Sequence, residues 1–149
     1  MNYNFAFIIK SNSLNYLIIN TLTHKKTITM EQEFSLYQNI GGDTTLRSMI
    51  DAFYELVYQH PIINRLFVGD ITVIKEKQRL FLTQFLGGPT LYTEIHGHPR
   101  MRARHLPHTI TQTDASAWLE CMHKAIDTLD ISNELKLELF NRFPKTAFF

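Results

Sequence analysis

The sequence predicts an all-α fold, and three observations support this class. Beyond residue 31, apolar residues recur at intervals of three and four, which is the spacing of one buried helix face. Gly-Gly pairs and prolines interrupt these stripes where a helix would have to end. The chain shows no convincing strand pattern and no internal repeat.

Composition allows one domain with a sizeable core, because 44% of the 149 residues are hydrophobic and 11 are phenylalanine. The net charge of +1 provides no global field that would attract nucleic acid or an anionic membrane. Cys121, the single cysteine, excludes an internal disulfide and is expected to be a small buried residue. The apolar run at residues 5–9 is too short to cross a bilayer. We therefore expect a cytoplasmic protein with no membrane or nucleic-acid partner.

The first 30 residues differ from the remainder. Residues 1–29 contain five asparagines and no acidic residue, and their apolar residues follow no period. We interpret residues 1–30 as an extension outside the domain, and residues 31–149 as the domain itself.

The first half of the domain predicts three helices. A short one covers residues 34–40 and ends at Gly41-Gly42; a stronger one is capped by Asp43 or Thr44 and closes at Pro61. After a short apolar link at residues 62–67 and a turn at Gly69-Asp70, a third helix covers about residues 72–86 and ends at Gly87-Gly88-Pro89. The second helix buries the stripe Leu46, Met49, Ile50, Phe53, Tyr54 and Val57.

Two polar side chains fall on these apolar stripes. Gln78 completes the stripe of the third helix, between Ile74 and Phe81, and a buried amide needs hydrogen bonds. It is either an edge residue that reaches water or a donor aimed into an apolar cavity. Tyr54 is either a core tyrosine bonded to a backbone carbonyl or a second polar group of that cavity.

The second half predicts two more helices. Thr111 and Asp114 resemble a capping box, and the helix that follows is core-facing, with the stripe Trp118, Cys121, Met122, Ala125, Ile126 and Leu129. Trp118 is either core filler or part of a site. Ser132 or Asn133 caps a last helix that continues to Phe143, where Pro144 interrupts it.

The most unusual stretch runs from residue 96 to 108 and carries four histidines and three arginines. His105 is the preferred metal ligand there, because it precedes Leu106-Pro107, where a helical turn should stop. An imidazole facing apolar walls with a few polar groups fits haem, whose carboxylates the arginines could pair with. The expected cavity is lined by Tyr54, Phe67, Ile74, Gln78, Phe81 and Trp118.

These residues resemble the truncated haemoglobins of group II over residues 34–143. The most specific match is the run at residues 76–89, Glu-Lys-Gln-Arg-Leu-Phe-Leu-Thr-Gln-Phe-Leu-Gly-Gly-Pro. Further matches follow in order at residues 91–94, 97–100, 102–107 and 117–122, and both Gly-Gly pairs fit the family's glycine motifs. The resemblance implies a two-over-two helical globin.

The resemblance also implies the roles of the site residues. His105 would be the proximal iron ligand of haem b, iron protoporphyrin IX, with its other ring nitrogen donating to a backbone carbonyl. Tyr54, Gln78 and Trp118 would form the distal set. Contacts with haem are expected from Phe67, Ile74, Lys77, Phe81, Tyr92 and Arg104, of which Lys77 and Arg104 are plausible partners for the propionates.

The implied function is reversible binding of dioxygen and other diatomic gases, with slow oxygen release. The sequence does not separate oxygen transport from redox detoxification of nitric oxide or peroxide, which would need a reductase, and a monomer or weak homodimer is expected. Three positions depart from the family. Ile74 stands where many globins have histidine, His108 replaces a usual phenylalanine, and Pro144 shortens the last helix.

Three other interpretations remain. Zinc could be bound by His96, His98, His105 and His108, although no cysteine or carboxylate completes a familiar pattern. Nucleic acid could bind Arg100, Arg102 and Arg104, although no stacking aromatic lies among them. The chain could also be a helical structural protein without a cofactor.

Overall fold

The structure is a computed structural model that describes residues 10–11, 14–15 and 33–148. The chain divides into two units, Met1–Glu33 and Phe34–Phe149. In the first unit, β1 (Lys10–Ser11) pairs antiparallel with β2 (Leu14–Asn15). The sequence did not predict this pairing, because strands of two residues are too short to show an alternating pattern. Most of the extension predicted at residues 1–30 lies outside the described residues.

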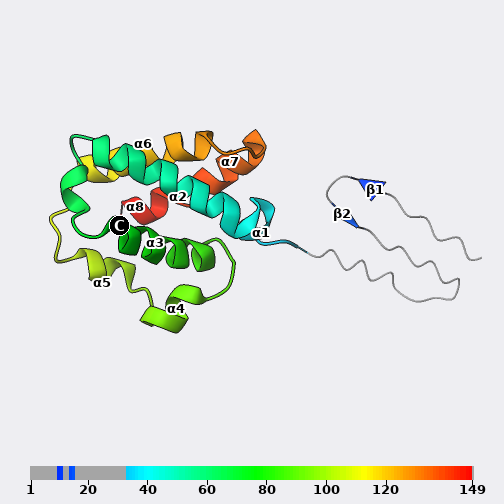
Figure 1. The fold of residues 1–149 in the computed structure, drawn as a ribbon, viewed down its shortest axis with the longest axis horizontal. Helices are drawn as coiled ribbons and strands as arrows, with labels where there is room; N and C mark the ends of the chain where they lie inside the picture. The colour runs from blue at the N-terminus through cyan, green and yellow to red at the C-terminus, as the bar shows by residue number, and fades with distance from the viewer. Residues whose placement is uncertain (1–9, 12–13, 16–32, 149) are drawn as a thin grey trace, which may run out of the picture. The chain divides into compact units, whose positions relative to one another are not determined.

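The second unit is helical, which confirms the all-α class for the domain (Figure 1). The helices expected at residues 34–40 and 72–86 are present within two residues of these bounds. The segment at residues 62–67, expected as a plain link, contains a turn of 3-10 helix. The elements are α1 (Leu36–Asn39), α2 (Gly42–Gln59), η1 (Asn64–Leu66), α3 (Ile71–Phe85), α4 (Leu91–His96), α5 (Met101–His105), α6 (Gln112–Asp127), α7 (Asn133–Phe140) and α8 (Pro144–Ala147).

Side-chain caps mark where α1, α3, α6 and α7 begin. The predicted capping box at α6 is present, with Thr111 Oγ1 accepting from the Asp114 amide, and Ser132 caps α7. The predicted cap of α2 is wrong: its N-cap is Gly41, with φ of +102°, and no side chain caps it. Asp43 lies one residue inside the helix, where its carboxylate bonds the Arg47 guanidinium at 2.7 Å instead of a backbone amide.

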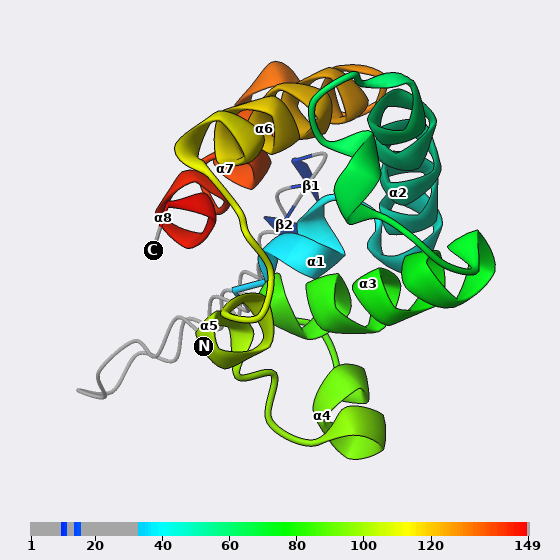
Figure 2. The same cartoon turned by 90° about the vertical axis from the view of Figure 1, so that its left-hand side faces the viewer.

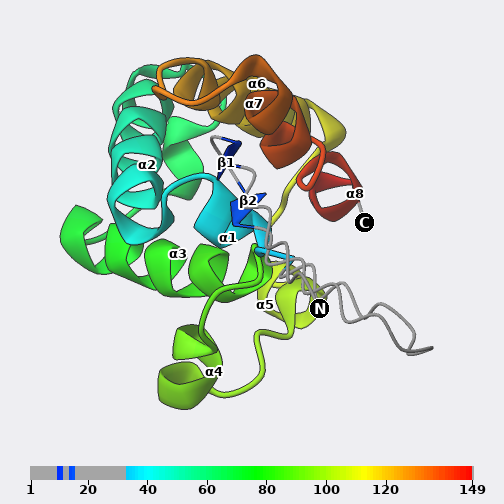
Figure 3. The ribbon, with the colours of Figure 1, turned by 90° about the vertical axis from the view of Figure 1, so that its right-hand side faces the viewer.

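The core forms where α2 packs against α3 and α6. In the two side views α2 and α8 lie on opposite sides, with α6 along one edge and α3 along the other (Figures 2 and 3). The predicted stripes of α2 and α6 face this core, which supports the helical spacing argument. Each large apolar side chain that is fully buried contributes about 1.5–3 kcal/mol. The buried members on α2 and α6 are Leu46, Met49, Ile50, Phe53, Tyr54, Val57, Ala117, Cys121, Met122, Ala125 and Ile126.

The Gly87-Gly88 turn ends α3 and fixes α1 against it. Gly87 has φ of +89°, and the Gly88 amide donates to the Thr83 carbonyl at 2.8 Å. A Cβ on Gly88 would lie 2.7 Å from Tyr37 Cδ1 and 2.8 Å from the Thr83 carbonyl oxygen. This close approach requires glycine, and it lets the Tyr37 amide reach the Leu86 carbonyl at 2.9 Å.

The last predicted helix ends at Phe140, before the expected Phe143, and Pro144 starts a new helix instead. It occupies the first turn of α8, where proline lacks only an amide that would have no helical partner. Phe143, the residue before it, is buried, and α8 contacts α6. The described residues contain no helix long and apolar enough to span a bilayer.

Candidate functional site

His105 is the last residue of α5, as its place before Leu106-Pro107 predicted. Its Nδ1 lies 2.7 Å from the Met101 carbonyl oxygen, one helical turn earlier. A carbonyl can only accept, so Nδ1 carries a hydrogen, and in the neutral tautomer that makes this bond Nε2 has the lone pair. The ring is exposed, and Nε2 makes no hydrogen bond to any residue that the structure describes. This is the tautomer that an Nε2 metal ligand needs, with the backbone bond that usually orients it.

Tyr54 and Gln78 meet across α2 and α3. The Tyr54 hydroxyl donates to Oε1 of Gln78 and not to a backbone carbonyl. Tyr54 is buried and Gln78 is half-buried. Burial, with a smaller contribution from Tyr58, raises the pKa of Tyr54 well above its usual 10.0. The phenol therefore stays protonated, and remains a donor, at neutral pH.

A continuous series of rings joins the predicted site residues. We call it the aromatic arc; its order is Phe67, Tyr54, Phe53, Trp118, Phe143, Phe85, Phe81 and Tyr92. Successive ring centroids lie 5.7, 5.1, 5.3, 5.6, 6.0, 5.4 and 5.9 Å apart, within the range of favourable aromatic pairs. The arc connects Phe67, Tyr54 and Trp118 to Phe81 and Tyr92. Aromatic side chains of this kind are typical of the walls of ligand pockets.

Three members of the arc were not predicted as site residues. Phe53 and Phe85 lie on apolar helix stripes, and Phe143 lies at the end of the last predicted stripe. A stripe identifies a residue as buried but does not say which neighbours it meets. Phe143 connects the two halves of the arc, since its ring contacts those of both Trp118 and Phe85.

Arg104 lies at the Tyr92 end of the arc. Its guanidinium carbon is 5.7 Å from the centre of the Tyr92 ring, a cation–π distance. Its Nε donates to the Pro99 carbonyl at 2.8 Å, and its Nη2 lies 3.5 Å from the His96 carbonyl. Arg104 thus faces backbone oxygens, and its exposed side chain is available to a carboxylate on the solvent side.

Three predicted residues are not joined to the others by any described polar or aromatic contact. Ile74 is half-buried and packs against the core. Lys77 is exposed, and within residues 33–148 it has no hydrogen bond or ion pair in the structure. His105 shares no such contact with Tyr54, Gln78 or Trp118.

The zinc interpretation finds no support in the described part of the chain. There, no three histidine, cysteine, aspartate or glutamate side chains come together as a metal-binding group. The four histidines of residues 96–108 are all exposed. His98 Nδ1 accepts from the Arg100 amide at 3.1 Å, and the ring of His96 packs 4.9 Å from that of Tyr92.

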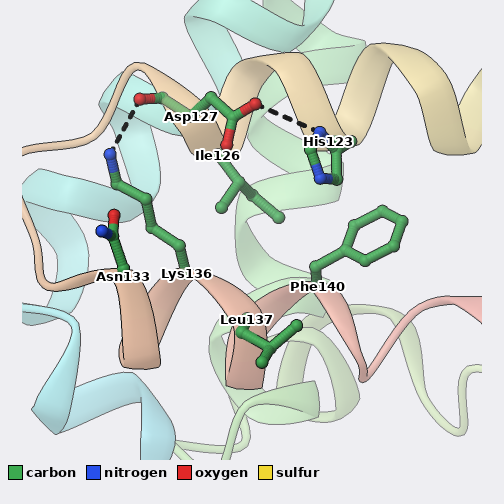
Figure 4. Close-up of a pocket in the computed structure, with 7 residues that line it drawn as sticks. All are labelled: His123, Ile126, Asp127, Asn133, Lys136, Leu137 and Phe140. Atoms are coloured by element: carbon green, nitrogen blue, oxygen red, sulfur yellow. Dashed lines mark hydrogen bonds and ion pairs between the residues drawn. The ribbon is translucent and has the colours of Figure 1, made fainter.

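A surface hollow of about 160 Å³ lies elsewhere, between α6 and α7 (Figure 4). It is smaller than the about 300–1,000 Å³ of ordinary ligand sites, and no predicted haem contact lines it. Two of its polar side chains are engaged: His123 faces Asp127 at 3.1 Å, and Lys136 reaches the Asp127 carbonyl at 2.8 Å. The hollow is therefore separate from the predicted site residues.

Comparison with known proteins identifies the family. Residues 35–149 match the family model described as Bacterial-like globin. A group 2 truncated haemoglobin of Bacillus subtilis is 47% identical over 118 residues, covering 79% of this chain and 89% of that protein. A group 2 truncated haemoglobin of Lotus japonicus is 35% identical over 119 residues, covering 77% and 70%.

Solved structures give the same answer. The group II truncated haemoglobin of Bacillus anthracis superposes with a TM-score of 0.75 at 44% identity, covering 78% of this chain and 90% of that one. A structure described as a truncated oxygen-avid haemoglobin of Bacillus subtilis has a TM-score of 0.72 at 47% identity, covering 76% and 96%. The two-over-two fold and a haem cofactor follow, and the chain belongs to the bacterial-like globins as a truncated haemoglobin of group II.

Proposed function

We propose that this chain binds one haem b through Nε2 of His105 and uses it to bind dioxygen and other diatomic gases reversibly. The observation that carries the proposal is the bond between His105 Nδ1 and the Met101 carbonyl, which leaves Nε2 free and fixes the ring. When bound, haem supplies an iron atom with one face open to a small ligand. The imidazole of His98 differs from that of His105, because Nδ1 of His98 accepts a hydrogen bond and Nδ1 of His105 donates one.

The walls suit a large flat group. Phe67, Phe81 and Tyr92 belong to the aromatic arc, and Ile74 adds an apolar contact from α3. Arg104 and Lys77 would hold the propionates on the solvent side. For Arg104 this requires exchanging carbonyl partners for a carboxylate, which gives a stronger, charge-assisted bond.

The distal side supplies hydrogen-bond donors to a ligand that gains partial negative charge. Tyr54 provides a neutral hydroxyl and Trp118 an indole N–H, which can only donate. Gln78 accepts the Tyr54 hydroxyl, so it controls how freely that hydrogen can turn toward the ligand. Donors placed in a dry pocket stabilise the partial negative charge on the ligand, and this slows dissociation of the ligand. We therefore propose slow oxygen release.

The same donors would serve oxygen delivery or redox work. Peroxidase-like or nitric oxide dioxygenase-like activity would also need electrons from a reductase. Reversible oxygen binding is the part that the residues support directly, and a related Bacillus subtilis structure is described as oxygen-avid. We further propose a cytoplasmic protein that is a monomer or weak homodimer.

The direct test compares histidine variants of haem-loaded protein. His105→Ala should lose haem during gel filtration and lose the visible spectrum of a histidine-ligated globin. His108→Ala is the matched control, because it removes an exposed imidazole three residues away and should retain haem. Stopped-flow displacement of oxygen by carbon monoxide then measures release. If His105→Ala retains haem normally, or if only His108→Ala loses it, the iron ligand is a residue other than His105.

A further inference from the structure

An ion pair between an exposed arginine and a buried aspartate joins two segments that carry predicted site residues. Asp114 is 1% exposed, and both of its carboxylate oxygens lie 2.7 Å from Nη2 of Arg65. The same carboxylate accepts from the Thr111 amide and hydroxyl, each at 2.8 Å. The Thr111 amide, its hydroxyl and then Arg65 hold the pKa of Asp114 below its ordinary 3.8, so the pair is charged at neutral pH.

The two partners lie next to residues of the aromatic arc. Arg65 is in η1, two residues before Phe67, and Asp114 is in the first turn of α6, four residues before Trp118. Residues four apart share a helix face, so Asp114 and Trp118 project from the same side of α6. On the inner side, Phe53 contacts Phe67 at 6.5 Å and Trp118 at 5.3 Å between ring centroids.

The ion pair is the outer connection between these segments. Among the described hydrogen bonds and ion pairs, no other joins residues 62–68 to α6. Apolar contacts with Phe53 have no strict direction, whereas two short charge-assisted bonds fix distance and orientation. The pair therefore determines how far η1 and the start of α6 can separate.

We propose that Arg65 and Asp114 are positioning residues, which set the separation between Phe67 and Trp118 and thereby hold the Trp118 indole at the distance from which it contacts a bound ligand. The ligand part of this inference rests on the proposed function. The effect on Trp118 does not, because it concerns packing within the chain. Displacements of a polar group by fractions of an ångström are enough to alter its bond to a ligand.

Arg65→Gln removes the charged partner of Asp114, and with it the described partner of Oδ1. Arg65 is 52% exposed, and in its absence Asp114 keeps both Thr111 donors, so the variant should fold. Arg65→Lys is the rescue variant. Because one nitrogen of Arg65 makes both contacts, a single ammonium can replace it.

The first measurement needs no haem, because Trp118 is the only tryptophan. Acrylamide quenching of its fluorescence should increase about twofold in Arg65→Gln and return toward wild type in Arg65→Lys, since α6 is released at its start. Lys124→Gln is the matched control. It removes a 2.6 Å ion pair to Glu120 on the same helix that does not reach η1, and it should leave quenching unchanged.

The second measurement uses the haem-loaded protein. Oxygen release should be about three- to tenfold faster in Arg65→Gln, corresponding to partial loss of one hydrogen bond, and near wild type in Arg65→Lys and Lys124→Gln. Unchanged quenching in Arg65→Gln, or an equal change in Lys124→Gln, would overturn the positioning role. If wild-type protein binds no oxygen while Arg65→Gln still alters quenching, the proposed function fails and the positioning of Trp118 stands.

Discussion

Replacing Gln78 by leucine should slow oxygen release, although it removes a polar residue from the distal set. The Tyr54 hydroxyl donates to Gln78 Oε1, so its hydrogen must leave that bond before it can turn to a ligand. Such a bond contributes about 1 kcal/mol net. Gln78→Leu removes this competition, and the gain corresponds to about fivefold slower release.

Stopped-flow mixing of the oxygenated protein with excess carbon monoxide at neutral pH measures this rate. Gln84→Leu is the matched control, because Gln84 lies on the same helix but accepts from the Thr93 amide at 2.9 Å, toward α4. Its release rate should not change. In a Tyr54→Phe background, Gln78→Leu should have no further slowing effect, since no hydroxyl remains to be freed.

Faster release from Gln78→Leu would refute this reasoning. It would show that the amide of Gln78 is itself the donor to the ligand, and that Tyr54 orients it. If Gln78→Leu slows oxygen release in the wild-type background but not in the Tyr54→Phe background, the Tyr54 phenol acts on the ligand directly.

Three further predictions concern the site and its frame. Trp118→Phe should speed oxygen release about tenfold in the same assay, because the indole is a donor that phenylalanine lacks; an unchanged rate would remove Trp118 from the distal set. Gly88→Ala should lower the free energy of unfolding by about 2–3 kcal/mol in urea denaturation, since its Cβ meets Tyr37 and backbone. Gly97→Ala should cost about 1–3 kcal/mol from backbone strain alone, because φ of +70° with ψ of −168° is a conformation essentially restricted to glycine and nothing lies within 4 Å of its Cβ. An unchanged free energy of unfolding in Gly88→Ala would contradict the packing argument. Quenching of Trp118 should be constant from about pH 8 to pH 5 and rise below about pH 4, because Asp114 has a lowered pKa and its contribution is lost only as pH falls through that value. A rise between pH 7 and pH 5 would point to another group.

The sequence predicted local features of the fold well. The capping box of Thr111 and Asp114 and the end of α5 at His105 each depend on residues within one turn. The predicted cap of α2 is wrong because the chain adopts a left-handed conformation at Gly41, two positions before Asp43, an acidic residue that would otherwise be preferred as a cap. A pattern of residue types does not reveal which of several nearby candidates becomes the N-cap.

Contacts between distant segments were much harder to predict. Arg65 and Asp114 are 49 residues apart, and nothing in either neighbourhood marks them as partners. Tyr54 and Gln78 were each predicted as polar residues on an apolar stripe, but the sequence did not predict the hydrogen bond between them. Their pairing depends on how α2 and α3 cross. The roles assigned to His105, Lys77 and Arg104 toward haem remain predictions from family resemblance.

Phe143 gives the order in which the pocket can be built during synthesis. Every other ring of the aromatic arc is translated earlier, between Phe53 and Trp118, and among the described aromatic pairs only Phe143 contacts both Trp118 and Phe85. Until the ribosome has released that residue, no ring of the arc connects its two halves. Capture of the cofactor should therefore follow translation of Phe143, and nascent chains that stall before it should bind haem poorly.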